Sequence, residues 1–117
     1  MTGVAPQRLK RRAEFLRVAS KGRKAAVHGL VLQALPHAEP GAPARLGFTV
    51  TKKIGNAVVR NRTRRRLKEA ARLLLAGHPI SGVDVVLIGR EATRSRPFAA
   101  LMDDVARALA KAGVPAP

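Results

Sequence analysis

Hydrophobic residues recur along the chain with two different spacings, and these spacings predict the order of its helices and strands. Helical spacing of three or four residues appears in three segments: within residues 8–24, from residue 57 to residue 76, and from residue 98 to residue 112. Three shorter apolar segments have the length and branched residues of strands, at residues 25–35, 46–51 and 83–88. The predicted order is therefore α β β α β α, which favours an α+β fold with helices packed on a mixed sheet.

Glycine and proline residues mark the ends of these segments. The first helix is expected to end near Gly22, the second at residues 77–79, and the third to begin at Pro97 and end at Gly113. Residues 36–44, PHAEPGAPA, are predicted to form a loop. Residues 1–7 show no periodic pattern and are expected to form a flexible arm. With 117 residues and no internal repeat, the chain is predicted to be one domain, residues 1–117.

The segment from residue 52 to residue 72 combines helical spacing with a one-sided distribution of charge. Asn56 follows Gly55 and is expected to cap the helix, because its side chain accepts a hydrogen bond from a free N–H at the helix start. One side of the predicted helix is expected to pack on the core: Val59, Thr63, Leu67, Ala70 and Leu74. The opposite side is polar and mainly cationic, with Arg60 and Arg62 flanking it: Asn61, Arg64, Arg65, Lys68 and Arg72.

Positive charge is concentrated in two parts of the chain. The sequence has 23 Lys and Arg residues against 7 Asp and Glu residues, and residues 8–24 and 52–68 together hold sixteen of these cations. Like-charged neighbours on a helix repel by roughly 0.2–0.5 kcal/mol per pair, and the helix dipole disfavours cations at the N-terminus. A helix face that merely meets solvent normally mixes both signs. The net charge of +16 and its placement therefore predict a polyanionic partner, nucleic acid before an anionic membrane.

Several classes of protein are disfavoured by what the sequence lacks. Without cysteine it has no disulfide framework and no cysteine-bound zinc. No apolar run approaches the ~18 residues that cross a bilayer, and no secretory signal is evident, so we expect a cytoplasmic protein. The only aromatic residues are 3 Phe, which argues against a multi-base stacking platform. The carboxylates are scattered and the histidines share no metal-ligand spacing, so no catalytic or metal-binding residue is predicted.

The residues from Gly47 to Lys68, GFTVTKKIGNAVVRNRTRRRLK, resemble the signature of the bacterial ribonuclease P protein subunit, with its RNR motif at residues 60–62. The N-terminal stretch RLKRRAEFLRV resembles the opening helix of the same family. The resemblance spans nearly the whole chain. It implies a single-domain α/β sandwich whose helix with the RNR motif makes a left-handed βαβ crossover, although the general rule favours right-handed connections.

The resemblance also implies a function and a set of contacts. Members of the family join a catalytic RNA that removes the 5′ leader of precursor tRNA, with Mg²⁺ held mainly by that RNA. The expected partners are ribonuclease P RNA and precursor tRNA, with no membrane and no required protein partner. The implied RNA-binding residues are Lys52, Lys53, Asn56, Arg60, Asn61, Arg62, Arg64, Arg65 and Lys68, and the implied leader-binding residues are Phe15, Arg17 and Gln33.

Two positions depart from the family pattern in the leader-binding region. Ala19 stands where relatives often have a second aromatic residue, and Gln33 stands where the sheet often presents a tyrosine. We hypothesise that phosphate contacts compensate for the reduced stacking, from Arg17, Lys21 or Arg23.

Two other classes of protein share the size and charge of this chain. One is a structural RNA-binding protein, such as a ribosomal protein. The RNR run within TKKIGNAVVRNR separates the ribonuclease P resemblance from this class. A DNA-binding or membrane-surface protein is disfavoured because the basic helix is flanked by strands rather than by a partner helix, and because its apolar side is expected to pack on the sheet.

Overall fold

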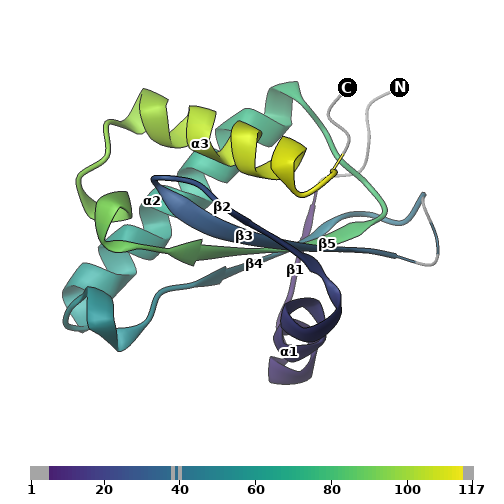
Figure 1. The fold of residues 1–117 in the computed structure, drawn as a ribbon, viewed down its shortest axis with the longest axis horizontal. Helices are drawn as coiled ribbons and strands as arrows, with labels where there is room; N and C mark the ends of the chain where they lie inside the picture. The colour runs from purple at the N-terminus through teal and green to yellow at the C-terminus, as the bar shows by residue number, and fades with distance from the viewer. Residues whose placement is uncertain (1–5, 38, 40, 115–117) are drawn as a thin grey trace.

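The computed structural model describes residues 6–37, 39 and 41–114. The elements follow the predicted order, which is confirmed, and Figure 1 shows their arrangement. The helices are α1 (Arg12–Lys21), α2 (Ala57–Gly77) and α3 (Phe98–Lys111), with short 3₁₀ helices η1 (Lys52–Ile54) and η2 (Glu91–Arg94). The strands are β1 (Gln7–Arg8), β2 (Arg23–Ala26), β3 (Leu30–Pro36), β4 (Arg45–Thr49) and β5 (Val83–Gly89).

Within the described residues, the strands form one sheet in the order β1-β4-β5-β3-β2. Strand β4 is parallel to both of its neighbours, whereas β3 is antiparallel to β5 and to β2. The sheet is therefore mixed, as predicted.

Two segments near the N-terminus differ from the prediction. The single strand expected over residues 25–35 is a hairpin, in which β2 and β3 pair antiparallel around a turn at residues 27–29. Gln7, expected in a flexible arm, belongs to β1, and its backbone N–H donates to the carbonyl of Ala44 at 2.7 Å. The rest of the predicted arm, apart from Pro6, lies outside the described residues.

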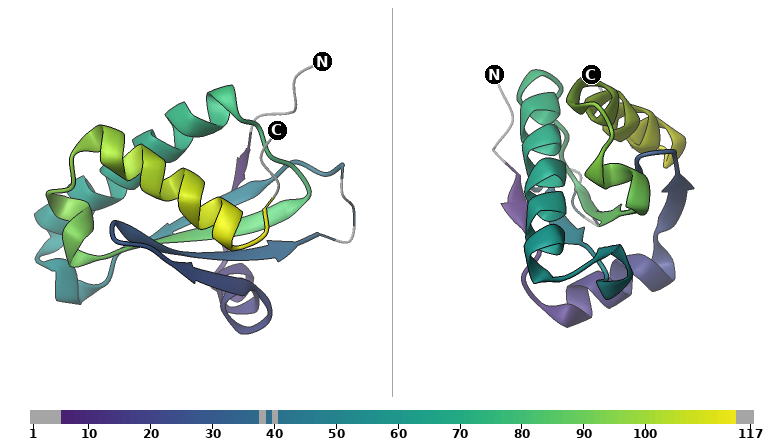
Figure 2. Two further views of the ribbon diagram at one scale, coloured as in Figure 1. Left: turned by 45° about the horizontal axis from the view of Figure 1, so that its top comes forward. Right: turned by 90° about the vertical axis from the view of Figure 1, so that its left-hand side faces the viewer.

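Helices α2 and α3 cover one face of the sheet, and α1 crosses the other face (Figures 1 and 2). The main core lies between the sheet and the two covering helices. Its fully buried side chains include Leu30, Leu32, Leu67, Leu87 and Leu101. Under α1 there is a smaller cluster of Leu9, Val18 and Val86. Part of the face under α1 stays accessible to solvent, because Val31, Gln33 and Ile88 on this face are only partly buried.

Gly22 ends α1, as predicted, but not through a left-handed conformation. Its backbone is extended, with φ −82°. A Cβ atom at this position would lie 2.6 Å from the carbonyl oxygen of Val18 and 2.7 Å from that of Ala34. Glycine is therefore required here by the close approach of the helix end to β3.

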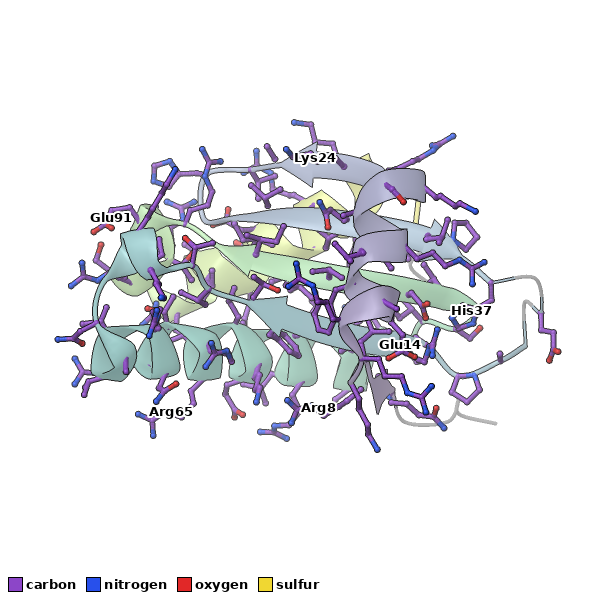
Figure 3. The ribbon with its side chains drawn as sticks, turned by 90° about the horizontal axis from the view of Figure 1, so that it is seen from below. Arg8, Glu14, Lys24, His37, Arg65 and Glu91 are labelled. Atoms are coloured by element: carbon purple, nitrogen blue, oxygen red, sulfur yellow. The ribbon has the colours of Figure 1, made fainter. Side chains whose placement is uncertain are left out.

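Strands β4 and β5 are parallel neighbours connected through α2. In Figure 3, both strands run from right to left, β5 lies above β4, and α2 lies behind the sheet. A connection with this geometry is left-handed, as the family resemblance implies, and is an exception to the general rule. No helix in the described part of the chain is long and apolar enough to span a bilayer.

Candidate nucleic-acid interface

The start of α2 is fixed by three consecutive residues. Ile54 is buried and anchors η1 to the core. Gly55 has φ 152°, a backbone conformation that residues with a Cβ atom rarely adopt. The side chain of Asn56 accepts a hydrogen bond from the backbone N–H of Val59 at 3.0 Å, which confirms the predicted cap. Lys52 and Lys53 are exposed immediately before this cap and extend the positive charge beyond the helix start.

The buried side of α2 is the predicted one. Thr63, Leu67 and Ala70 are buried, and the Thr63 hydroxyl donates to the carbonyl of Val59 at 2.8 Å, so this polar side chain is satisfied within the helix. Since this side faces the sheet, the opposite side faces solvent. This outer side holds Asn61 and Arg65, which are exposed, and Arg64 and Lys68, which are half-buried. Arg60, half-buried, and Arg62, exposed, flank it, and Arg62 lines a different pocket toward η2. Arg65 projects from the outer edge of the molecule in Figure 3.

A shallow pocket lies on this outer side of α2. It is lined by Val58, Asn61, Arg64, Arg65 and Lys68. Val58 is 64% exposed and provides an apolar surface beside the cations. Arg64 donates through Nη1 to the side-chain oxygen of Asn61 at 2.9 Å, which orients one guanidinium along the helix.

Arg66 does not belong to the outer side. Its Nε donates to the carbonyl of Thr93 at 3.1 Å, and its Nη2 donates to the carbonyl of Arg96. Its guanidinium also lies 5.9 Å from the centre of the Phe98 ring, within range of a cation–π interaction. Arg66 therefore connects α2 to η2 and to the start of α3, and it is a structural residue within the basic run.

The predicted RNA-binding cations of α2 lack carboxylate partners in the described structure, whereas Arg72, further along the helix, pairs with Glu69. The ion pairs found there join Glu14 and Asp84 to Arg45, Asp84 to His37, Glu69 to Arg72, Glu91 to Arg94, and Asp104 to Arg96. None of the predicted RNA-binding residues takes part in them. The outer side of α2 is therefore an uncompensated positive surface, and its self-repulsion would be relieved by a polyanion.

The pKa of Lys68 is lowered from its ordinary value. The largest cause is partial burial, and the charges of Arg8 and Arg64 add to it. Of these two charges, that of Arg8 belongs to a distant part of the sequence.

Phe15 and Gln33, two of the residues assigned to the leader, lie on the face of the sheet under α1. The Phe15 ring is half-buried and lies over β4, where a Cβ atom at Gly47 would approach the ring carbon Cε2 to 2.5 Å. Gln33 alternates with the core residues Leu32 and Ala34, so it points to the same face as Phe15. The structure therefore brings an aromatic ring and an amide to one accessible surface.

Arg17, the third of these residues, lies on the other side of α1. It is two residues after Phe15 and thus about 200° further around the helix. It lines a separate groove with Leu35, Pro36 and His37. The hypothesis that Arg23 also contacts the leader is not supported, because Arg23 pairs opposite Ala34 and its guanidinium lies beside Gly113 at the end of α3, on the opposite face.

Arg45, which the sequence analysis did not single out, attaches α1 to the sheet. It donates to Glu14 of α1 at 2.5 Å and to both carboxylate oxygens of Asp84 in β5, at 2.8 and 2.6 Å. The same carboxylate bonds to His37. Figure 3 shows Glu14 and His37 on the same side of α1. The sequence contained one signal for this network, because Asp84 is a lone carboxylate in an otherwise apolar strand and a buried charge needs a partner.

The pKa values of both carboxyl groups in this network are lowered. For Asp84, burial is the largest influence and raises the pKa, but hydrogen bonds from Arg45 and His37 and their charges outweigh it. For Glu14, hydrogen bonds from the backbone N–H groups of Arg11 and Lys10 lower the pKa most, and the charge of Arg45 adds to them. Both groups are therefore held ionised, and α1 is fixed by charge as well as by its few apolar contacts.

The described residues do not fit a magnesium site of their own. No three His, Asp or Glu side chains there lie close enough together to hold a metal ion. Asp103 and Asp104 diverge, because Asp103 is exposed whereas Asp104 is buried and bound by Arg96 at 2.7 Å.

Comparison with known proteins identifies the family. The sequence matches the family described as Ribonuclease P over residues 5–113. It is 65% identical over 107 residues to the ribonuclease P protein component of Gluconacetobacter diazotrophicus, an alignment that covers 92% of this chain and 91% of that relative. The ribonuclease P protein component of Paramagnetospirillum magneticum is 50% identical over 109 residues, 91% of this chain and 82% of the relative.

Solved structures agree with this assignment. A Staphylococcus aureus RNase P protein mutant with defective mRNA degradation activity is 29% identical with a TM-score of 0.77, covering 92% of this chain and 89% of that one. The RNase P protein from Thermotoga maritima is 25% identical with a TM-score of 0.75, covering 90% of this chain and 96% of that one. This chain therefore belongs to the ribonuclease P protein family.

Proposed function

We propose that this chain is the protein subunit of ribonuclease P. In this role it joins a catalytic RNA in the cytoplasm and assists the removal of the 5′ leader from precursor tRNA, without requiring another protein. The proposal is supported by the family match and by relatives that are named ribonuclease P protein components. Mg²⁺ ions held mainly by the partner RNA would supply the hydrolytic chemistry that leaves a 5′-phosphate on the mature tRNA.

The observation that carries the proposal is the uncompensated positive surface on the outer side of α2. Ribonuclease P RNA would lie along this surface, with its phosphates contacted by Arg60, Arg62 and Arg65 and by the lysines before the helix. Each phosphate contact releases counterions from the RNA, so binding should weaken steeply with salt. For roughly six to eight contacted phosphates, the slope of log affinity against log salt is on the order of −5.

The accessible part of the sheet beside α1 is the proposed site of the 5′ leader. Phe15 and Gln33 would contact the leader there, the ring by stacking and the amide by hydrogen bonding. Arg17 lies in the groove on the other side of α1, so it would meet the leader only where the strand crosses that helix.

Reconstitution tests this function directly. The protein is mixed with a bacterial ribonuclease P RNA, and leader removal is measured at low magnesium, where the RNA alone is slow. We expect Arg60→Ala and Arg62→Ala to lower the rate and the RNA affinity while leaving the unfolding temperature unchanged. Arg107→Ala, which removes an exposed arginine from the outer side of α3, is the matched control and should behave like the wild type.

Two results would refute the proposal. One is cleavage of precursor tRNA by the purified protein without RNA. The other is a reconstituted mixture in which the protein neither binds the RNA nor changes the rate of leader removal.

A further inference from the structure

Strand β1 brings an N-terminal cation to the side of α2. Leu9 packs in the small cluster under α1, and its backbone N–H donates to the carbonyl of Leu46 at 2.9 Å. Successive side chains in an extended segment point to opposite faces, so Arg8 points to the face that α2 covers. Its partner across the strand pair, Leu46, belongs to the main core on that same face. Figure 3 shows Arg8 and Arg65 along the same edge of the molecule.

Two cations of α2 complete a cluster with Arg8. Arg64 and Lys68 are four residues apart and therefore neighbours on the helix surface. Both are half-buried, whereas Arg8 is exposed at the edge of the sheet. The charges of Arg8 and Arg64 both help to lower the pKa of Lys68, which is consistent with all three groups facing one another.

Nothing in the described structure neutralises this cluster. The nearest carboxylate in sequence, Glu69, accepts from Nε and Nη2 of Arg72 at 3.0 and 2.6 Å, so it is already paired with another cation. None of the described ion pairs includes Arg8, Arg64 or Lys68. Three converging cations without a counter-ion are costly for the isolated protein and are suited to a ligand that brings negative charge.

We propose that Arg8, Arg64 and Lys68 together bind one backbone phosphate of the partner RNA, so that the RNA-binding surface continues from α2 across onto β1. The inference rests on the proposed function, because it takes the RNA to lie along α2. Two guanidinium groups offer paired N–H donors and the ammonium offers a point charge, a combination that matches the oxygens of a phosphate. Arg8 thereby joins the interface although α1 and three strands separate it from the basic helix along the sequence.

The test compares three variants with a matched control. Arg8→Gln, Lys68→Gln and the double variant are measured for affinity to ribonuclease P RNA over a range of salt concentrations, with Arg107→Gln as the control. We expect Arg8→Gln to weaken binding about tenfold, as for a lost charge-assisted hydrogen bond, and to reduce the salt slope by about one. We expect the fold-loss of RNA affinity in the double variant to be smaller than the product of the fold-losses in the two single variants, because both residues act on the same phosphate.

A second measurement needs no RNA. The pKa of the Lys68 ammonium is followed by NMR in the wild type and in Arg8→Gln. Removing a neighbouring positive charge should raise that pKa toward its ordinary value, whereas Arg107→Gln should leave it unchanged.

The outcomes separate this inference from the proposed function. If Arg8→Gln matches Arg107→Gln in affinity, salt slope and Lys68 pKa while Arg60→Ala still weakens binding, the shared phosphate site is wrong and the proposed function stands. Independent, multiplicative effects of the two single variants would also overturn the shared site. If no variant on α2 or β1 changes RNA binding, both the inference and the proposed function fail.

Discussion

Replacing Arg45 by methionine should destabilise the protein far more than its partial exposure suggests. The substitution keeps the apolar length of the side chain but removes the guanidinium that bonds Asp84 twice and Glu14 once. Asp84 is only 4% exposed, so its carboxylate would be left in the protein interior with His37 alone. The unpaired buried charge, rather than the lost contact itself, is the source of the expected cost.

The magnitude follows from the burial of the two partners. Removing one member of a fully buried ion pair costs about 3–5 kcal/mol. The Arg45 side chain is 31% exposed, and His37 remains beside Asp84, so we expect about 2–3 kcal/mol. For a domain of this size, that loss lowers the unfolding temperature by about 8–12 °C.

The loss of stability caused by Arg45→Met should also depend on pH in a defined direction. The pKa values of Asp84 and Glu14 are lowered in the folded protein, so their ion pairs stabilise it fully above the ordinary carboxyl range, about pH 4–5. This stabilisation is lost as the pH falls through the lowered values. The difference between the wild type and Arg45→Met should therefore be largest near neutral pH and shrink toward about pH 3.

Urea unfolding followed by circular dichroism at several pH values measures these effects. Arg72→Met is the matched control, because Arg72 also forms a two-bond pair with a carboxylate, but one in which the two side chains are 65% and 49% exposed. The control should lose much less stability, because solvent screens an exposed pair. If the two variants lose the same stability, or if the loss in Arg45→Met is as large at about pH 3 as near neutral pH, the account of a buried, charge-held α1 is wrong.

Three further predictions concern α2 and the face of the sheet under α1. Arg66→Met should lower the free energy of unfolding by about 1–3 kcal/mol, because two carbonyls lose their donor. Arg65→Met should instead keep this stability and lose RNA affinity, and unfolding and RNA binding measured on both variants test the difference. Asn56→Ala should cost about 1 kcal/mol of unfolding free energy and Asn56→Asp much less, because only alanine removes the cap. Gly47→Ala should force the Phe15 ring aside, costing about 1–3 kcal/mol in unfolding experiments and weakening leader binding.

The elements that sequence reasoning identified are those whose pattern is local. The apolar side of α2, its cap at Asn56 and its outer side follow from spacing along one helix, and the structure confirms them. The β2–β3 turn was missed because its stability is not local. Arg90 donates to the carbonyl of Val27 at 2.7 Å, and the hydroxyl of Thr93 donates to that of Gly29, so residues more than sixty positions away hold the turn.

The same distinction applies to the candidate interface. The row of cations on α2 is visible in the sequence, but the separation of Arg66 from that row depends on carbonyls of η2 and the segment after it. Arg8 shows the converse, because a two-residue strand has no periodic pattern, and only its pairing with β4 brings it beside α2. Positions that act through contacts between distant segments therefore required the three-dimensional structure.

The two edges of the sheet limit how copies of this chain can associate with one another. Edge strand β1 offers only two residues for pairing, and edge strand β2 carries the exposed cations Arg23 and Lys24. Lys111 also donates to the carbonyl of Ala26 at 3.1 Å, which occupies an acceptor at the end of β2. Short or charged edges resist the addition of a strand from another molecule. Edge-to-edge pairing of sheets from two molecules is thus hindered even when a polyanion cancels the mutual repulsion of these basic proteins.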